Sequence, residues 1–124
     1  MDHRPLILAI HACRHAGAPD RHLDARIALA VFPVLGELPM LSKGVWRHSD
    51  GSRVRALRYS ASCAAAGTLV PAGCWLEVRA GEAQIIGDQG AWSGFHSIEA
   101  IAICIAALRA RLNQKRYNTH GEAL

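Results

Sequence analysis

A short segment of the chain, residues 43–58, concentrates residues that can bind an anionic partner. Its basic residues are Lys43, Arg47, Arg53, Arg55 and Arg58. Asp50 is its one acidic residue, and the rest of the chain carries nine basic and nine acidic residues. The whole net charge of +4 therefore belongs to this segment. Arginines beside a tryptophan can contact phosphates and stack on bases, so one interpretation is a nucleic-acid surface. An acidic protein surface is a second partner, and a solvated face with Arg55 covering Trp46 is a third interpretation.

The pattern predicts that this segment is a β-hairpin. Residues 45–48 and 53–57 flank Ser49-Asp50-Gly51-Ser52, and Asp-Gly is typical of a two-residue type I′ turn. That register pairs Trp46 with Arg55 and Val45 with Ala56. One face then carries Trp46, His48, Arg53 and Arg55, and the other, expected to face inward, carries Val45, Arg47, Val54 and Ala56. The candidate binding residues are Lys43, Trp46, Arg47, His48, Arg53, Arg55 and Arg58.

Two histidines have a spacing that zinc sites use. His11 and His15 are four residues apart on a predicted helix, so their rings share a face. Cys13 points to the other side, and no carboxylate or paired cysteine completes a set of four ligands. We therefore interpret them as surface histidines and expect no metal ion and no cofactor.

Catalytic motifs are missing from the sequence. Ser93 and His96 lie in a glycine-rich turn, but Ser93 is not in a G-x-S-x-G elbow. There is no Walker A loop, no dinucleotide-binding glycine pattern and no HExxH motif. We expect a protein that is not an enzyme.

The element that must support these segments is a helix predicted over residues 97–112. Its large apolar residues recur at steps of three and four, and its opposite side is rich in alanine. A helix that is apolar nearly all round is buried on more than one side, either in the middle of the domain or at a dimer interface. Because this helix lacks polar side chains, we do not expect it to carry catalytic residues.

The remaining elements are predicted from periodicity and from Pro and Gly positions. We expect helices over 5–16, 20–31 and from Ser60 or Ser62 to 69, and strands over 74–80, 83–87 and around Trp92. In the second helix, Leu23, Ile27 and Ala30 are expected to face inward, and Arg21, Asp24 and Ala28 outward. The resulting class is α/β (α+β): a small antiparallel β-sheet with helices on both faces, a three-layer α-β-α sandwich. The single domain is predicted over 1–113, with a flexible tail over 114–124.

The cysteines and the N-terminus bear on the compartment. Cys13, Cys63, Cys74 and Cys104 are far apart and form no C-x-x-C pair, so we expect buried, reduced thiols. The first eighteen residues resemble a signal peptide only weakly, since His11 interrupts a short apolar run. No apolar run is long enough to cross a membrane. A cytoplasmic location follows as the expectation.

One stretch of the sequence carries a family resemblance. Residues 59–75, YSASCAAAGTLVPAGCW, resemble the pattern Tyr-Thr-x-Ser-x-Asp-Ala-Ala-x-x-Leu-Val-Pro-x-Gly-Trp of the phage ABA sandwich domain family. The matching positions are Tyr59, Ser62, Ala65, Ala66, Leu69, Val70, Pro71 and Gly73. Residues 20–28 and the closing helix also resemble helices of that family, whereas Ala64, Gly67 and Cys74 depart from its pattern. The resemblance implies a three-layer sandwich and a phage or prophage origin, and it implies no activity and no catalytic residues.

Together these observations predict a non-enzymatic accessory protein of a phage or prophage. It would act in the cytoplasm of the bacterial host by binding a host or phage protein with an acidic surface, for example to modulate or inhibit a host complex. Two alternatives stay open: a module that binds DNA or RNA through residues 43–58, and a structural protein that associates with itself as a homodimer.

Overall fold

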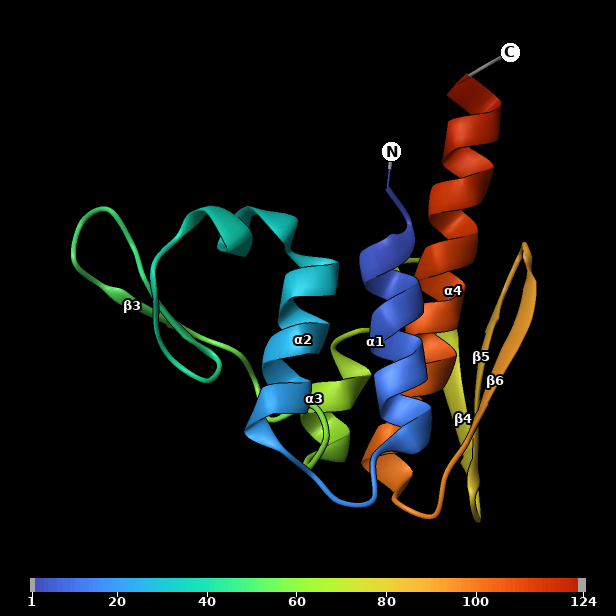
Figure 1. Cartoon of the computed structure of the whole chain (residues 1–124). Coiled ribbons are helices and arrows are strands. Elements are labelled where there is room, and N and C mark those ends of the chain that lie inside the picture. Colours follow the sequence, from blue (N-terminus) through green and yellow to red (C-terminus); the bar gives the residue numbers. More distant parts are fainter. Residues whose placement is uncertain (1, 123–124) are drawn as a thin grey trace.

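The fold combines helices with two separate antiparallel sheets (Figure 1). The computed structural model describes residues 2–122, with side chains as far as Arg116. Along the chain the elements are α1 (Arg4–His15), α2 (Arg21–Val31), η1 (Pro33–Glu37), β1 (Met40–Ser42), β2 (Val45–Arg47), β3 (Arg53–Arg55), α3 (Cys63–Gly67), β4 (Trp75–Arg79), β5 (Glu82–Gly87), β6 (Gly90–Phe95) and α4 (Glu99–Glu122). The predicted α+β class and the antiparallel strands are confirmed.

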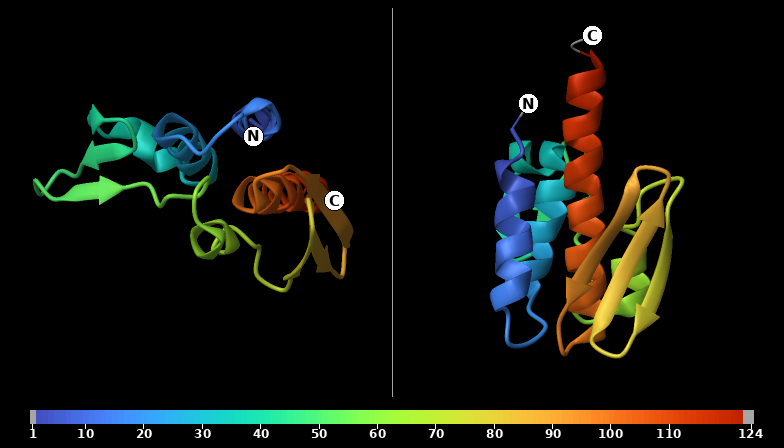
Figure 2. Two further views of the ribbon diagram at one scale, coloured as in Figure 1. Left: turned by 90° about the horizontal axis from the view of Figure 1, so that it is seen from below. Right: turned by 90° about the vertical axis from the view of Figure 1, so that its right-hand side faces the viewer.

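Helix α4 is the middle layer of the molecule. It lies between α1 on one side and the sheet β4-β5-β6 on the other, and it also contacts α3 (Figure 2). Every residue from Ala100 to Leu108 is buried, which confirms that this helix is buried all round. Isoleucines and leucines fill the spaces between layers, while alanines let neighbouring backbones approach closely.

The sheet β4-β5-β6 packs on α4 through one face only. Ala83 and Ile85 of β5 point toward α4 and are fully buried, together with Gly94 of β6. The opposite face is open, since Trp75 and Phe95 are 54% and 65% exposed. In Figure 2 no helix or strand of residues 2–122 covers this outer face.

The layer order therefore differs from the predicted sandwich with one sheet between two helical layers. Helices cover one face of β4-β5-β6, and the central layer is a helix instead of the sheet. The physical reason is the composition of α4: because it is apolar on all sides, it buries two opposite surfaces itself. The outward residues of β4, among them Glu77 and Arg79, are polar enough to remain in water.

The second sheet, β1-β2-β3, forms an arm that projects from the helices (Figure 1). We call residues 40–55 the arm. Its strands have three residues each, and a buried polar network holds its base to α2. Asp24 Oδ1 accepts hydrogen bonds from Ser60 N at 2.8 Å and Ser60 Oγ at 2.7 Å. The Arg21 guanidinium donates to Asp24 Oδ2 at 2.9 Å and to the carbonyl oxygens of Ala56 and Leu57 at 2.9 and 3.2 Å.

This network corrects the prediction for α2. Asp24 and Ala28 were expected to face outward, but both are 1% exposed. Helix α2 lies between α1 and the arm, so it is buried on two sides (Figure 1). Asp24 can be buried because hydrogen bonds satisfy both of its carboxylate oxygens.

Three further predictions concern the end of α4, the cysteines and the membrane. Helix α4 does not end near Leu112: the backbone of the predicted tail is helical through Glu122, and residues 123–124 lie outside the described residues. Cys13 and Cys104 are buried as expected, but Cys63 is exposed and its thiol lies 3.1 Å from Glu99 Oε2. No helix in the described part of the chain is long and apolar enough to span a bilayer.

Candidate binding site: the arm and the groove beside it

The arm pairs its strands one residue away from the predicted register. Val45 lies opposite Arg55, Trp46 opposite Val54, and Arg47 opposite Arg53. The connection is therefore a five-residue loop, 48–52, and not a two-residue turn. Within it His48 N donates to Ser52 O at 2.7 Å, and the Asp50 carboxylate accepts from Ser52 N at 2.9 Å. The side chain of Asp50 and the positive φ of Gly51, 87°, stabilise this longer loop.

The change of register exchanges the faces of the β2 side chains, while Arg53 and Arg55 of β3 stay on the outer face as predicted. Trp46 shares a face with Met40 and Val54 and is 1% exposed, so it belongs to the core. The opposite face carries three exposed arginines, which we call the arginine face: Arg47, Arg53 and Arg55. Arg47 was expected to face inward, and Trp46 to share a face with Arg53 and Arg55. Both expectations are wrong, because burying the indole decides the register.

The arginine face is an uncompensated cluster of positive charge. None of its three side chains makes an ion pair with a described residue. Arg47 and Arg53 are directly opposite each other, an arrangement in which like charges destabilise a strand pair. An anion bound across this face would relieve that repulsion.

The other predicted binding residues lie elsewhere. Lys43 is in the turn between β1 and β2, His48 is in the loop at the tip of the arm, and Arg58 follows β3 at its base. All three are exposed. Of the seven candidates, three thus lie together on one face, three are exposed outside that face, and Trp46 is buried.

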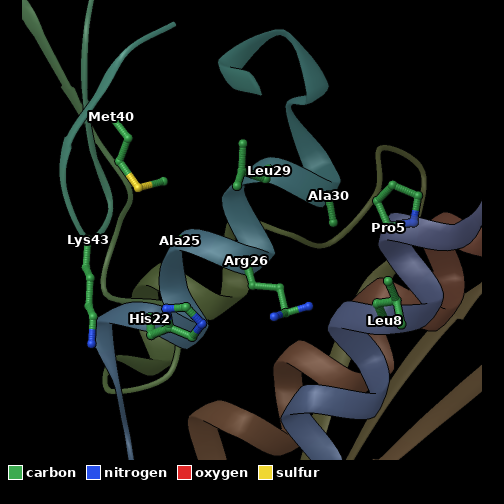
Figure 3. A pocket seen from close by; sticks show the side chains of 9 residues that line it. All are labelled: Pro5, Leu8, His22, Ala25, Arg26, Leu29, Ala30, Met40 and Lys43. Carbon is green, nitrogen blue, oxygen red and sulfur yellow. The ribbon is translucent and has the colours of Figure 1, made fainter. Parts of the chain in front are cut away.

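Beside the arm is an open groove of about 330 Å³ that the sequence did not predict. Helix α2 forms its floor, α1 forms one wall and the arm forms the other (Figure 3). It is lined by Pro5, Leu8, His22, Ala25, Arg26, Leu29, Ala30, Met40 and Lys43. These residues come from three distant segments, so no motif links them. The one available signal is that Leu8 and Met40 are large apolar residues outside the predicted stripes.

The groove has an apolar end and a cationic end. Figure 3 shows Met40, Leu29 and Pro5 toward one end and His22, Lys43 and Arg26 toward the other, where Leu8 also lies, on α1. None of the described residues that line it is acidic. The side chains of Arg26 and Lys43 form neither an ion pair nor a hydrogen bond with any residue that the structure describes.

The histidines and the serine that the sequence singled out do not assemble a reactive site. The rings of His11 and His15 are 4.3 Å apart between centroids, and no group of three potential metal ligands exists among residues 2–116. His96 lies with Nε2 2.7 Å from Ala16 O, and its Nδ1 accepts from Ile98 N at 2.9 Å. Both ring nitrogens are therefore engaged by the backbone, and neither is left for Ser93.

Two buried cysteine thiols have raised pKa values. Burial raises the pKa of Cys13 to about 12, with a smaller contribution from Asp24. Burial raises the pKa of Cys104 as well. A thiol activated for nucleophilic chemistry has a lowered pKa, so these side chains behave as core residues.

Comparison with protein-family models, curated proteins and solved structures finds no match to this chain. The resemblance to the phage ABA sandwich domain family therefore stays a prediction.

Proposed function

We propose that this protein binds another protein, and that its arginine face contacts an acidic surface of that partner. The observation that carries the proposal is the set of three exposed arginines on one face of a projecting arm, none of them neutralised by a described residue. Planar guanidinium groups can pair with carboxylates in bidentate geometry, and such charges steer a partner toward the arm.

The alternative, a nucleic-acid surface, has less support. Phosphate contacts remain available to the arginines, but the tryptophan that would stack on a base is buried behind the opposite face of the arm. Without that aromatic, the arm retains only charge, and charge alone binds nucleic acid without sequence preference.

The biological setting is part of the same proposal. A non-enzymatic accessory role in a phage or prophage, in the cytoplasm of the host, is what the family resemblance and the lack of catalytic motifs support. The genes that flank the gene for this protein test this setting. Flanking genes unrelated to phages would contradict it.

Reversal of charge on the arginine face tests the binding role. The tagged protein is used to capture partners from bacterial lysate and is compared with the double variant Arg53→Glu/Arg55→Glu. A matched control, Arg79→Glu/Arg116→Glu, changes exposed arginines of β4 and α4, outside the arm and the groove, and lowers the net charge by the same amount. We expect a partner that the wild type and the control recover and the arm variant loses.

Two results would contradict the proposal. Recovery of the partner by the arm variant would show that the arginine face is not the contact. Binding of short DNA or RNA at about 50 mM salt, with a steep salt dependence that the arm variant loses, would assign the face to nucleic acid instead.

A further inference from the structure

We infer that the groove along α2 binds one short amphipathic helix of the partner, with apolar side chains facing Leu29 and carboxylates facing Lys43 and Arg26. This inference rests on the proposed function, because it specifies a second contact with the same partner protein. It goes beyond the arginine face because the groove lies on different side chains and recognises a different feature of the partner.

The apolar side chains that line the groove provide the binding energy. Leu8 and Met40 are 45% and 49% exposed, although each is a large hydrophobic side chain beside the groove. Leu29 lies between them on the floor (Figure 3). Exposed apolar side chains that converge on one concave surface are typical of sites for protein partners.

The cationic end selects the charge of the occupant. Lys43 flanks this end from the arm, the guanidinium of Arg26 is directed toward α1 on the other side, and His22 lies between them (Figure 3). A lysine or arginine on the occupant would meet only positive charge there, while a glutamate or aspartate would meet two partners. Charge complementarity therefore favours an acidic occupant.

The shape of the floor favours a helix over a strand. The floor residues His22, Arg26 and Leu29 follow one stripe of α2 at steps of four and three, the ridge pattern onto which a second helix packs. The small side chains of Ala25 and Ala30 leave room for that helix to approach. An added strand would need a regular edge, but β1 has three residues and an irregular register with β2.

The floor also limits the length of the occupant. It extends from His22 to Ala30, about 12 Å at the rise of an α-helix. Two to three turns of a helix cover that distance. Apolar residues at positions i, i+3 or i+4, and i+7 of the occupant would meet the apolar end and the floor.

A designed peptide tests this inference without knowledge of the natural partner. The probe is a capped peptide of about 14 residues with leucines at helical spacing and glutamates on the remaining positions. Two comparison peptides carry lysine in place of glutamate, or the same residues reordered so that no apolar stripe exists. Binding is followed by NMR of the leucine and methionine methyl groups in the full-length protein.

We expect the acidic amphipathic peptide to shift the methyl signals of Leu8, Leu29 and Met40, and to bind at least about tenfold more tightly than either comparison peptide. Equal binding of the reordered peptide would overturn the inference, because general attraction of acid to a basic protein would then suffice. Shifts confined to the arm loop, or no binding, would overturn it too.

The chain offers two matched pairs of variants. Leu8→Glu is compared with Ile7→Glu, and Met40→Glu with Leu41→Glu, because the members of each pair are adjacent and similarly exposed while only the first lines the groove. We expect about tenfold weaker binding for the groove variants and less than about a twofold change for their neighbours. Circular dichroism confirms that each variant is folded, and equal effects within each pair would contradict the groove as the site.

The two proposals fail independently. If Arg53→Glu/Arg55→Glu loses the lysate partner while the peptide does not enter the groove, the arginine face stands and the helix-binding groove is wrong. If the peptide binds in the groove and the arm variant still captures the partner, the groove stands and the arginine face is wrong.

Discussion

The two three-stranded sheets of this protein are built for opposite purposes. In β4-β5-β6 the strands are five or six residues long, and the inner face lies flat on the central helix α4. In β1-β2-β3 the strands have three residues, and the sheet is attached to the body at its base. The comparison shows that one sheet completes the hydrophobic core, while the other carries exposed arginines on a projection from the helices.

The attachment of each sheet depends on a different kind of contact. The core sheet needs close backbone approach at Gly94, where an added Cβ would clash with Ala102 O and lie 2.7 Å from Ala106 N. The arm needs one buried tryptophan and the hydrogen bonds of Arg21, Asp24 and Ser60. Changes at these two attachments should therefore have different consequences.

The largest effect of a single substitution is expected for Gly94→Ala. Because the added methyl group must displace the backbone of α4, we expect a loss of about 3 kcal/mol in the free energy of unfolding. The measurement is urea denaturation, in which the whole cooperative unfolding transition should move to lower urea concentration. Gly67→Ala is the matched control: it lies in α3 with nothing within 4 Å of an added Cβ, and it should be neutral or slightly stabilising. A stable Gly94→Ala protein would show that the sheet is not held as tightly as described.

A smaller effect, restricted to the arm, is expected for Asp24→Ala. The substitution leaves the amide and hydroxyl of Ser60 and the guanidinium of Arg21 without their carboxylate, which we expect to cost about 2 kcal/mol. Hydrogen exchange should accelerate at residues 44–57 and remain slow in α4. Asp88→Ala, at an exposed position, serves as the control and should change stability by less than about 0.5 kcal/mol. Equal acceleration in α4 would mean that the arm and the core unfold as one unit.

Alkaline pH should act on the core and spare the arm. The folded protein keeps the Cys13 proton up to a pKa of about 12, whereas the unfolded chain releases it near the ordinary value of 9.0. The folded state therefore binds more protons in this window, and stability falls as the pH rises from about 9 to about 12, by up to about 1.4 kcal/mol per pH unit. Urea unfolding at several pH values measures the slope, and Cys13→Ala should reduce it. If the free energy of unfolding of that variant fell equally steeply with pH, groups other than Cys13 would be responsible for the alkaline destabilisation.

The smallest change in stability is expected for Arg53→Glu, with the opposite sign. The substitution turns the like-charge pair with Arg47 into an opposite-charge pair, so the arm should become more stable by about 0.5 kcal/mol. Partner capture should fall at the same time, because the arginine face is interrupted. Thermal unfolding and the capture experiment are carried out on the same preparation. A variant that loses both stability and binding would suggest that Arg53 has a structural role.

Much of the architecture could be predicted from local patterns. Residues 97–112 are apolar on every side, which already implies burial between two layers, and Asp20 and Ser62 cap α2 and α3 through their side chains as such residues do. The strands after Cys74 follow from alternation and from the Gly81 turn. The position of the net charge is likewise a property of the sequence alone.

The tertiary structure decided which faces these elements present. Asp50-Gly51 is compatible with a two-residue turn or a five-residue loop, and the choice depends on whether Trp46 can be buried, which local sequence does not encode. Asp24 is buried because Ser60, thirty-six residues away, satisfies it. The groove exists because α1, α2 and β1 converge, and only the packed chain brings Leu8, Leu29 and Met40 together. Composition thus determined that this protein has a buried central helix and a basic segment. Long-range packing determined that the segment is an arm, with three arginines that pair with no described residue on one face and a groove along its other side.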